Sequence, residues 1–290
     1  MEFLTTLLNG LSLGGIYAMI ALGYTMVYGI AKMLNFAHGD IIMVGAYTVV
    51  TFLSIRVHPI FAVLIAAVFC AVLAVLMEKL AYKPLRGASP LAVLITAIGV
   101  SYLLQSLALI IFGTGDKHAQ MSSLGMLTIG ELSIKYETII ILLCSAVLMV
   151  ALNLFVKFTR TGRAMIAVSE DKGAAQLMGI NVNFIITITF AIGAALAALA
   201  GMFKLMNCEA ATPVFGSLPG IIAFTAAVVG GIGSIPGAMV GGLMLGVIEC
   251  FSLSIPALAN YSNAIQFAIL IIILLVKPTG LLGKKRREKV

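Results

Sequence analysis

The sequence predicts an all-α integral membrane protein, a polytopic helical bundle of about 8–9 membrane segments, some broken or re-entrant. Hydrophobic residues make up 61% of the 290 residues and charged residues 10%, whereas soluble domains hold about 45–50% and about 25%. The apolar stretches are long and continuous rather than alternating, which favours helices over an outer-membrane barrel. Lipid offers the backbone no hydrogen-bond partners, and a helix satisfies its own polar groups.

The chain contains nine apolar blocks. About 20 helical residues cross a hydrocarbon core about 30 Å thick, so the first six blocks are long enough to span it. The last three are marginal and are candidates for re-entrant half-helices. In order, the blocks are 3–31, 36–55, 60–81, 91–112, 138–158, 184–206, 218–232, 237–253 and 261–276.

Positive charge predicts how these blocks are oriented. With the N-terminus outside and nine crossings, 14 Lys and Arg residues fall inside and 4 outside, in agreement with the positive-inside rule. The basic tail 277–290 is then cytoplasmic and close to membrane lipid, which accounts for the net charge of +7 without nucleic acid. Because Met1-Glu2 lacks the cationic start of a signal peptide, we expect the first block to be a retained membrane helix. An arrangement with eight crossings and one re-entrant block remains open.

Three polar side chains, Asn35, His38 and Asp40, stand with Gly39 at the mouth of the second block. Ionisable groups at membrane depth are costly and usually face a cavity or a partner. One interpretation is therefore a broken helix whose start lines a solute path. A second is helix capping, in which Asn35 or Asp40 accepts from free backbone N–H groups. A metal site is a weaker third interpretation, because three mixed ligands lack a second cluster, and we predict no metal.

Clustered glycines and a proline break the apolar sequence between residues 230 and 237. The segment lacks the Gly-Lys-Ser/Thr ending of a phosphate loop. Helix breaks survive in membranes where they pack on protein or line a cavity, so Gly231, Gly233 and Pro236 indicate either tight packing or gating. Gly-x-x-x-Gly spacings predict that helices approach closely; they occur at 10/14, 237/241 and 242/246.

Glu249 is a carboxylate inside the block 237–253. A partner such as Asn260, or extension of the side chain to the membrane interface, would satisfy it. A proton relay would need more intramembrane carboxylates than this chain supplies.

A polar island, residues 158–181, interrupts the apolar sequence and carries both signs of charge. Two apolar flanks, 162–168 and 174–178, surround a charged centre, Ser169–Gly173. Gly179 is placed to end the second piece as a C′ glycine. A surface elbow of this kind suits docking into a cleft on another protein, and an amphipathic helix lying in the membrane interface is the alternative.

Several long segments follow one another in an order that a known family shares. They are 9–18, 21–29, 34–40, 161–164, 170–171, 174–175, 179–181, 223–238 and 277–283. Together they resemble the LivH-type branched-chain amino acid permeases of ABC importers over nearly the whole chain. Several ordered matches are more specific than any single motif.

The resemblance implies a transmembrane permease subunit, one domain over 1–290, of an ATP-driven importer for leucine, isoleucine and valine. It implies alternating access in the bacterial cytoplasmic (inner) membrane. The partners would be a second homologous permease, two cytoplasmic ATPase subunits and a periplasmic or lipid-anchored solute-binding protein. ATP and Mg would bind to the ATPases, so we expect this subunit to have no cofactor and no catalytic residues.

In such a permease the island is the cytoplasmic coupling loop, 159–183. The residues assigned to ATPase coupling are Gly162, Arg163, Glu170, Asp171, Ala174, Ala175 and Gly179. The candidates for the solute path or gating are Asn35, His38, Gly39, Asp40, Gly231, Gly233 and Pro236.

Other functions remain as alternatives. Relatives of this shape also carry amides or urea. From other classes, the rivals are an ATP-independent secondary transporter or channel, and a membrane enzyme built on His38 and Asp40, which lacks a convincing nucleophile. Neither rival needs the segment 163–179.

Overall fold

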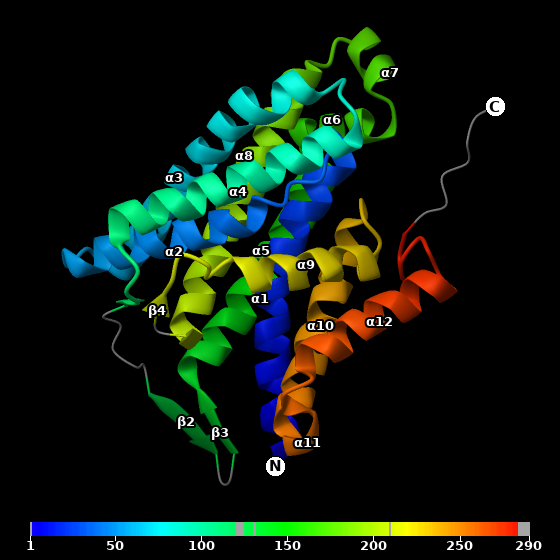
Figure 1. Ribbon diagram of the computed structural model, residues 1–290. Coiled ribbons are helices and arrows are strands. Elements are labelled where there is room, and N and C mark those ends of the chain that lie inside the picture. The colour runs from blue at the N-terminus through cyan, green and yellow to red at the C-terminus, as the bar shows by residue number, and fades with distance from the viewer. Residues whose placement is uncertain (1, 120–124, 130–131, 209, 284–290) are drawn as a thin grey trace. The chain divides into compact units, whose positions relative to one another are not determined.

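The computed structural model describes residues 2–119, 125–129, 132–208 and 210–283, and these form a helical membrane protein, as predicted (Figure 1). Within them, six helical stretches are long and apolar enough to cross a membrane. They are α1 (Glu2–Ala31), α3 (Pro59–Met77) with its extension to Leu85, α4 (Pro90–Phe112), α5 (Tyr136–Phe158), α8 (Val182–Cys208) and α10 (Ile235–Ser254). Shorter apolar helices are α2 (His38–Ser54), α9 (Ser217–Gly230) and α12 (Ser262–Val276).

Each apolar block corresponds to one helix, but two lengths differ from the prediction. The block 36–55 is predicted to span, yet α2 has 17 residues, because the chain is not helical before His38. The block 237–253 is predicted to be marginal, yet α10 has 20 residues. Its start is extended because Ser234 Oγ accepts a hydrogen bond from Gly237 N–H at 3.2 Å.

Packing divides the chain into two compact units. Residues 26–123 and 154–221 form one, called here the α3–α8 unit, and residues 1–25, 124–153 and 222–290 form the other, the α10 unit. The prediction of a single permease domain over 1–290 stays a prediction. Most of the basic tail, residues 284–290, lies outside the described residues.

In the α3–α8 unit, α2, α3 and α8 pack against one another (Figure 1). Small residues allow the backbones to come close, which is how membrane helices associate. A Cβ atom added at Gly45 would lie 2.7 Å from Ala198 Cα, and one added at Gly201 would lie 2.6 Å from the Ile42 carbonyl oxygen. Larger residues would therefore separate α2 from α8.

Loops that are predicted on the same side of the membrane meet in this unit. Lys172 Nζ donates to the Ala31 carbonyl at 2.8 Å, and Arg86 donates to Asn183, which joins the loops after the first, third and fifth blocks. The strands β1 (Lys117–His118) and β4 (Ala210–Ala211) pair antiparallel and join the loops after the fourth and sixth. These contacts agree with the predicted alternation, and which side is cytoplasmic stays a prediction.

In the α10 unit, the Gly-x-x-x-Gly spacings bring helices together as predicted. A Cβ atom at Gly14 would lie 2.7 Å from Leu243 Cα, and one at Gly246 would lie 2.1 Å from Gly14 N. The backbones of α1 and α10 therefore touch, and only glycine fits at these positions. In the same unit β2 (Met126–Ile129) and β3 (Leu132–Lys135) pair antiparallel just before α5.

Glu249 on α10 is satisfied by helix residues rather than by Asn260. Its Oε2 atom accepts hydrogen bonds from Tyr17 Oη at 2.8 Å and from Gln266 Nε2 at 2.6 Å. These bonds connect α10 with α1 and α12 and give the carboxylate a structural role.

Candidate functional site

The start of α2 places the predicted path residues in a buried position. Asn35, His38 and Asp40 are 3%, 1% and 2% exposed. The chain from Lys32, whose φ is +61°, to Ala37 is not helical. Backbone turns then begin the helix: His38 N–H donates to the Asn35 carbonyl at 3.2 Å, and Asp40 N–H to that of Ala37 at 3.1 Å.

The polar side chains here tie α2 to other helices. The N-cap residue, Ala37, has no side-chain hydrogen bond, and Asn35 Oδ1 accepts from Tyr82 Oη at 2.6 Å instead of from a backbone N–H. Asp40 Oδ1 accepts from Gln105 Nε2, on α4, at 2.8 Å. Among the described residues, no group of three or more His, Cys, Asp or Glu side chains is placed to hold a metal ion.

The helix α9 begins beside the start of α2. A Cβ atom at Gly39 would lie 2.8 Å from the Gly216 carbonyl oxygen, and one at Gly216 only 1.8 Å from the Gly39 carbonyl oxygen. Gln105 Nε2 also lies 3.4 Å from Oγ of Ser217, the first residue of α9. Two short helices thus start together, next to an amide and a carboxylate. Helix N-termini at membrane depth carry partial positive charge that suits anionic groups of a solute.

The other predicted path segment, 230–237, belongs to the α10 unit and forms a tight turn. Gly231 and Gly233 have φ values of +109° and +93°, in the region that favours glycine. Pro236 lies in the first turn of α10, where its missing N–H costs nothing. These three residues have local structural reasons to be present, and a gating role for them stays a prediction.

The segment 277–283 completes the C-terminal end of α9. Leu281 N–H donates to the Val229 carbonyl at 2.8 Å, and Leu282 N–H donates to the Gly230 carbonyl at 2.9 Å. Such carbonyls have no partner within their own helix. A Cβ atom at Gly231 would lie 2.5 Å from Gly283 N, so the two turns fit together only without that side chain.

The polar island forms an elbow of two helices, α6 (Arg160–Glu170) and α7 (Lys172–Leu177). Asp171 separates them and caps α7, because its Oδ1 atom accepts from Gly173 N–H at 2.8 Å and Ala174 N–H at 3.0 Å. The two-piece elbow is therefore as predicted, but Asp171 has a capping role that the sequence analysis did not identify.

Gly179 ends α7 as the predicted C′ glycine. Its φ is +82°, and Ile180 N–H donates to the Ala175 carbonyl at 3.0 Å while Gly179 N–H donates to that of Gln176 at 3.0 Å. This is the Schellman arrangement, in which a left-handed residue lets the last carbonyls of a helix be satisfied.

The elbow has a buried side and an exposed side. Gly162 and Ala175 are buried, and a Cβ atom at Gly162 would lie 2.4 Å from Val156 Cα, so glycine allows α6 to pack on α5. The remaining predicted coupling residues are exposed: Arg163, Glu170, Asp171, Ala174 and Gly179. Beside them, Leu177 and Met178 are 90% and 82% exposed. This apolar pair is not among the residues predicted for coupling, although its position just before a C′ glycine is a signal that could have identified it.

Three polar residues that connect these regions, Glu78, Arg86 and Gln105, were not predicted from the sequence. Glu78 is 1% exposed and pairs with Arg86, and Gln105 bonds to Asp40. A carboxylate or amide in an apolar block normally requires a polar partner. By this rule Glu78 and Gln105 could have been predicted from the sequence to have partners. Sequence alone does not show which partner each one finds.

Comparison with known proteins identifies the class. A family model described as "Branched-chain amino acid transport system / permease component" matches residues 6–274. The chain is 43% identical over 303 residues to the high-affinity branched-chain amino acid transport system permease protein BraD of Pseudomonas aeruginosa, covering 100% of this chain and 98% of BraD. It is 41% identical over 304 residues to the corresponding protein LivH of Escherichia coli, covering 99% and 98%.

The chain therefore belongs to the family of permease components of branched-chain amino acid transport systems. Its fold is shared with a chain in the structure of PsaBC from Streptococcus pneumoniae in complex with Fab, with a TM-score of 0.52 over 96% of this chain and 93% of that one. The identity there is 15%, so this second comparison concerns the fold alone.

Proposed function

We propose that the chain is the transmembrane permease subunit of an ATP-driven ABC importer for leucine, isoleucine and valine. The observation that carries this proposal is identity of 41–43% along essentially the full length of two permeases of high-affinity branched-chain amino acid systems. We place the subunit in the bacterial inner membrane, with its N-terminus outside and its C-terminus in the cytoplasm. The 14:4 distribution of Lys and Arg supports that orientation.

The elbow is the proposed docking site for a cytoplasmic ATPase. Leu177 and Met178 present an apolar tip, and Arg163 and Glu170 present charge beside it. A second homologous permease and two ATPases complete the membrane assembly, and ATP and Mg bind to the ATPases. A periplasmic or lipid-anchored binding protein delivers the solute. Movement of the ATPase pair then reorients the helices by alternating access, and the coupling between nucleotide and solute is reciprocal.

The joint start of α2 and α9 is the proposed solute path. There Asp40, Gln105 and Ser217 gather at two helix N-termini. The double variant His38→Ala with Asp40→Asn should lose ATP-dependent leucine uptake while the ATPases still assemble on it. Normal uptake by that variant would show that these side chains only support the fold.

Isolation from the native membrane tests the assembly. The tagged protein, solubilised in mild detergent, should co-purify with two ATPases and a second permease. Recovery of the chain alone, under conditions that preserve other ABC complexes, would favour an ATP-independent transporter. Competition experiments distinguish the proposed solutes from the amide or urea alternative. Excess isoleucine or valine should inhibit leucine uptake, whereas acetamide and urea should not.

A further inference from the structure

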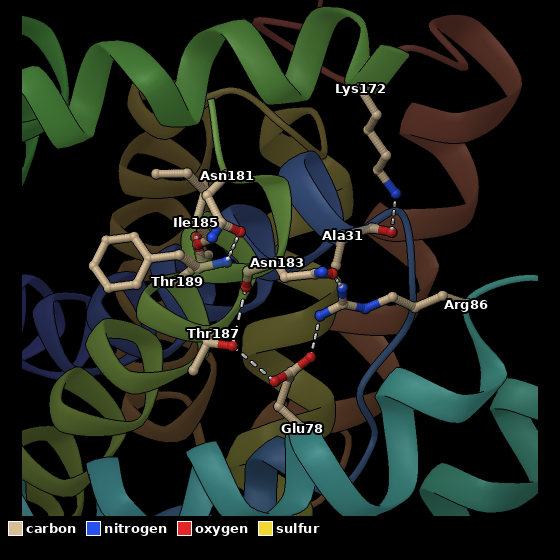
Figure 2. A network of polar contacts seen from close by, with 10 residues as sticks. Ala31, Glu78, Arg86, Lys172, Asn181, Asn183, Ile185, Thr187 and Thr189 are labelled. Atoms are coloured by element: carbon tan, nitrogen blue, oxygen red, sulfur yellow. Dashed lines mark hydrogen bonds and ion pairs between the residues drawn. The ribbon is translucent and has the colours of Figure 1, made fainter. Parts of the chain in front are cut away.

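A buried polar network lies beneath the elbow (Figure 2). The Glu78 carboxylate is 1% exposed, pairs with the Arg86 guanidinium and accepts from Thr187 Oγ1 at 2.8 Å. Arg86 also donates to Asn183. Asn183 and Thr187 belong to the first two turns of α8, which begins five residues after α7 ends. The network therefore holds the end of α8 that directly follows the elbow.

Glu78 is the first residue of a π-helical turn. Residues Glu78–Tyr82 are π-helical (η1), and Lys83 N–H donates to the Glu78 carbonyl five residues back. Pro84, in the following 3-10 turn η2 (Lys83–Leu85), has no N–H to continue an α-helical pattern. Short π-helical turns of this kind occur frequently at functional sites.

The same turn also holds the start of α2. Its last residue, Tyr82, is 1% exposed and donates from Oη to Asn35 Oδ1 at 2.6 Å. Asn35 lies three residues before His38 and five before Asp40. The Tyr82 ring also packs near that of Phe190 on α8, with 5.5 Å between centroids. One five-residue turn thus contacts both α8, below the elbow, and the segment that begins α2.

We infer that the turn Glu78–Tyr82 is a mechanical link that sets the position of the α2 start according to where the elbow holds the start of α8. Glu78, Tyr82 and Thr187 are positioning residues in this link. The inference rests on the proposed function, because it connects the proposed docking site with the proposed solute path. A buried ion pair adds little net stability compared with apolar packing, whereas a hydrogen-bonded network fixes the relative position of the groups it joins.

A second contact runs in parallel. Lys172 Nζ, in α7, donates to the Ala31 carbonyl at the end of α1, seven residues before His38. Burial and the positive charge of Arg86 lower the pKa of Lys172, in keeping with its place beside the network. The elbow thus contacts Ala31 directly, just before the non-helical segment 32–37, while the turn contacts Asn35 inside that segment.

The test uses the complete importer, with its ATPases and binding protein, in proteoliposomes. Thr187→Val removes one hydroxyl that reaches Glu78, and Tyr82→Phe removes the hydroxyl that reaches Asn35. For each variant we expect the ratio of leucine transported to ATP hydrolysed to fall about fivefold or more, while ATP hydrolysis continues. A fivefold fall corresponds to the lower end of the usual range of coupling free energies. Thr187→Ser keeps the hydroxyl and should restore the wild-type ratio.

Thr189→Val is the matched control, because the Thr189 hydroxyl donates within its own helix, to the Ile185 carbonyl at 2.7 Å (Figure 2). A wild-type ratio in both Thr187→Val and Tyr82→Phe, or an equal fall in Thr189→Val, would overturn the inference. If Thr187→Val does not assemble, Tyr82→Phe alone decides. A wild-type complex that shows no ATP-dependent leucine uptake would instead refute the proposed function, and the link with it.

Discussion

Two glycines allow the starts of the short helices α2 and α9 to approach closely. Gly216 and Gly39 face each other so tightly that a methyl group at position 216 would lie 1.8 Å from a carbonyl oxygen. Gly216→Ala should therefore lower the free energy of unfolding by about 1–3 kcal/mol or more, as overpacking does. The measurement is the apparent melting temperature of the purified protein in detergent. Gly87→Ala is the control, because no atom of the described residues lies within 4 Å of a Cβ atom there; equal melting temperatures for the two variants would refute the packing.

The cap at Asp171 changes how the charges of the elbow have to be tested. Reversing Glu170 and Asp171 together would also uncap α7, at a cost of about 0.5–2 kcal/mol. Asp171→Asn keeps an equally good cap and removes only the charge. If that charge contributes to ATPase docking, Asp171→Asn should reduce leucine uptake per ATP without changing the melting temperature, and Glu170→Gln should add to the loss. Unchanged uptake in both would leave Asp171 with its capping role alone.

At the scale of elements, the C-terminal segment stabilises a helix far from it in sequence. Deleting residues 277–290 removes the two donors to Val229 and Gly230, each worth about 0.5–1.5 kcal/mol. We expect a clearly lower melting temperature than for deletion of 284–290, which keeps Leu281 and Leu282. Identical melting temperatures for the two deletions would contradict this role.

Helices were predictable here because lipid imposes them. Each apolar block forms one helix, because backbone polar groups in the membrane must form their hydrogen bonds within the segment. The C′ role of Gly179 followed from a local sequence rule. The reduced length of α2 did not follow from composition, because the residues before His38 are as apolar as many that are helical. Their non-helical conformation accompanies tertiary contacts, such as Tyr82 with Asn35.

The polar pairs were the least predictable part of the candidate sites. Glu78 and Thr187 are 109 residues apart in sequence, and Asp40 and Gln105 are 65 apart. Because an unpaired carboxylate in the membrane is energetically costly, the sequence indicates that each carboxylate has a partner. Only the packing of α2, α3, α4 and α8 determines which residue it is.

At the scale of the whole molecule, the orientation in the membrane can be measured directly. In a variant without Cys70, Cys144, Cys208 and Cys250, cysteines are introduced at Leu177 and, separately, at Tyr261, which are 90% and 63% exposed. A membrane-impermeant maleimide added to intact cells should label position 261 and not position 177. The opposite pattern would reverse the proposed orientation.

We propose that this permease transports solute only as part of an ATP-driven importer. The most direct measurement is uptake of labelled leucine into proteoliposomes that contain the complete complex, with binding protein outside and ATP or a non-hydrolysable analogue enclosed. We predict accumulation of leucine against its gradient with ATP and none with the analogue. Equal accumulation in both, or uptake by this chain reconstituted alone, would contradict it.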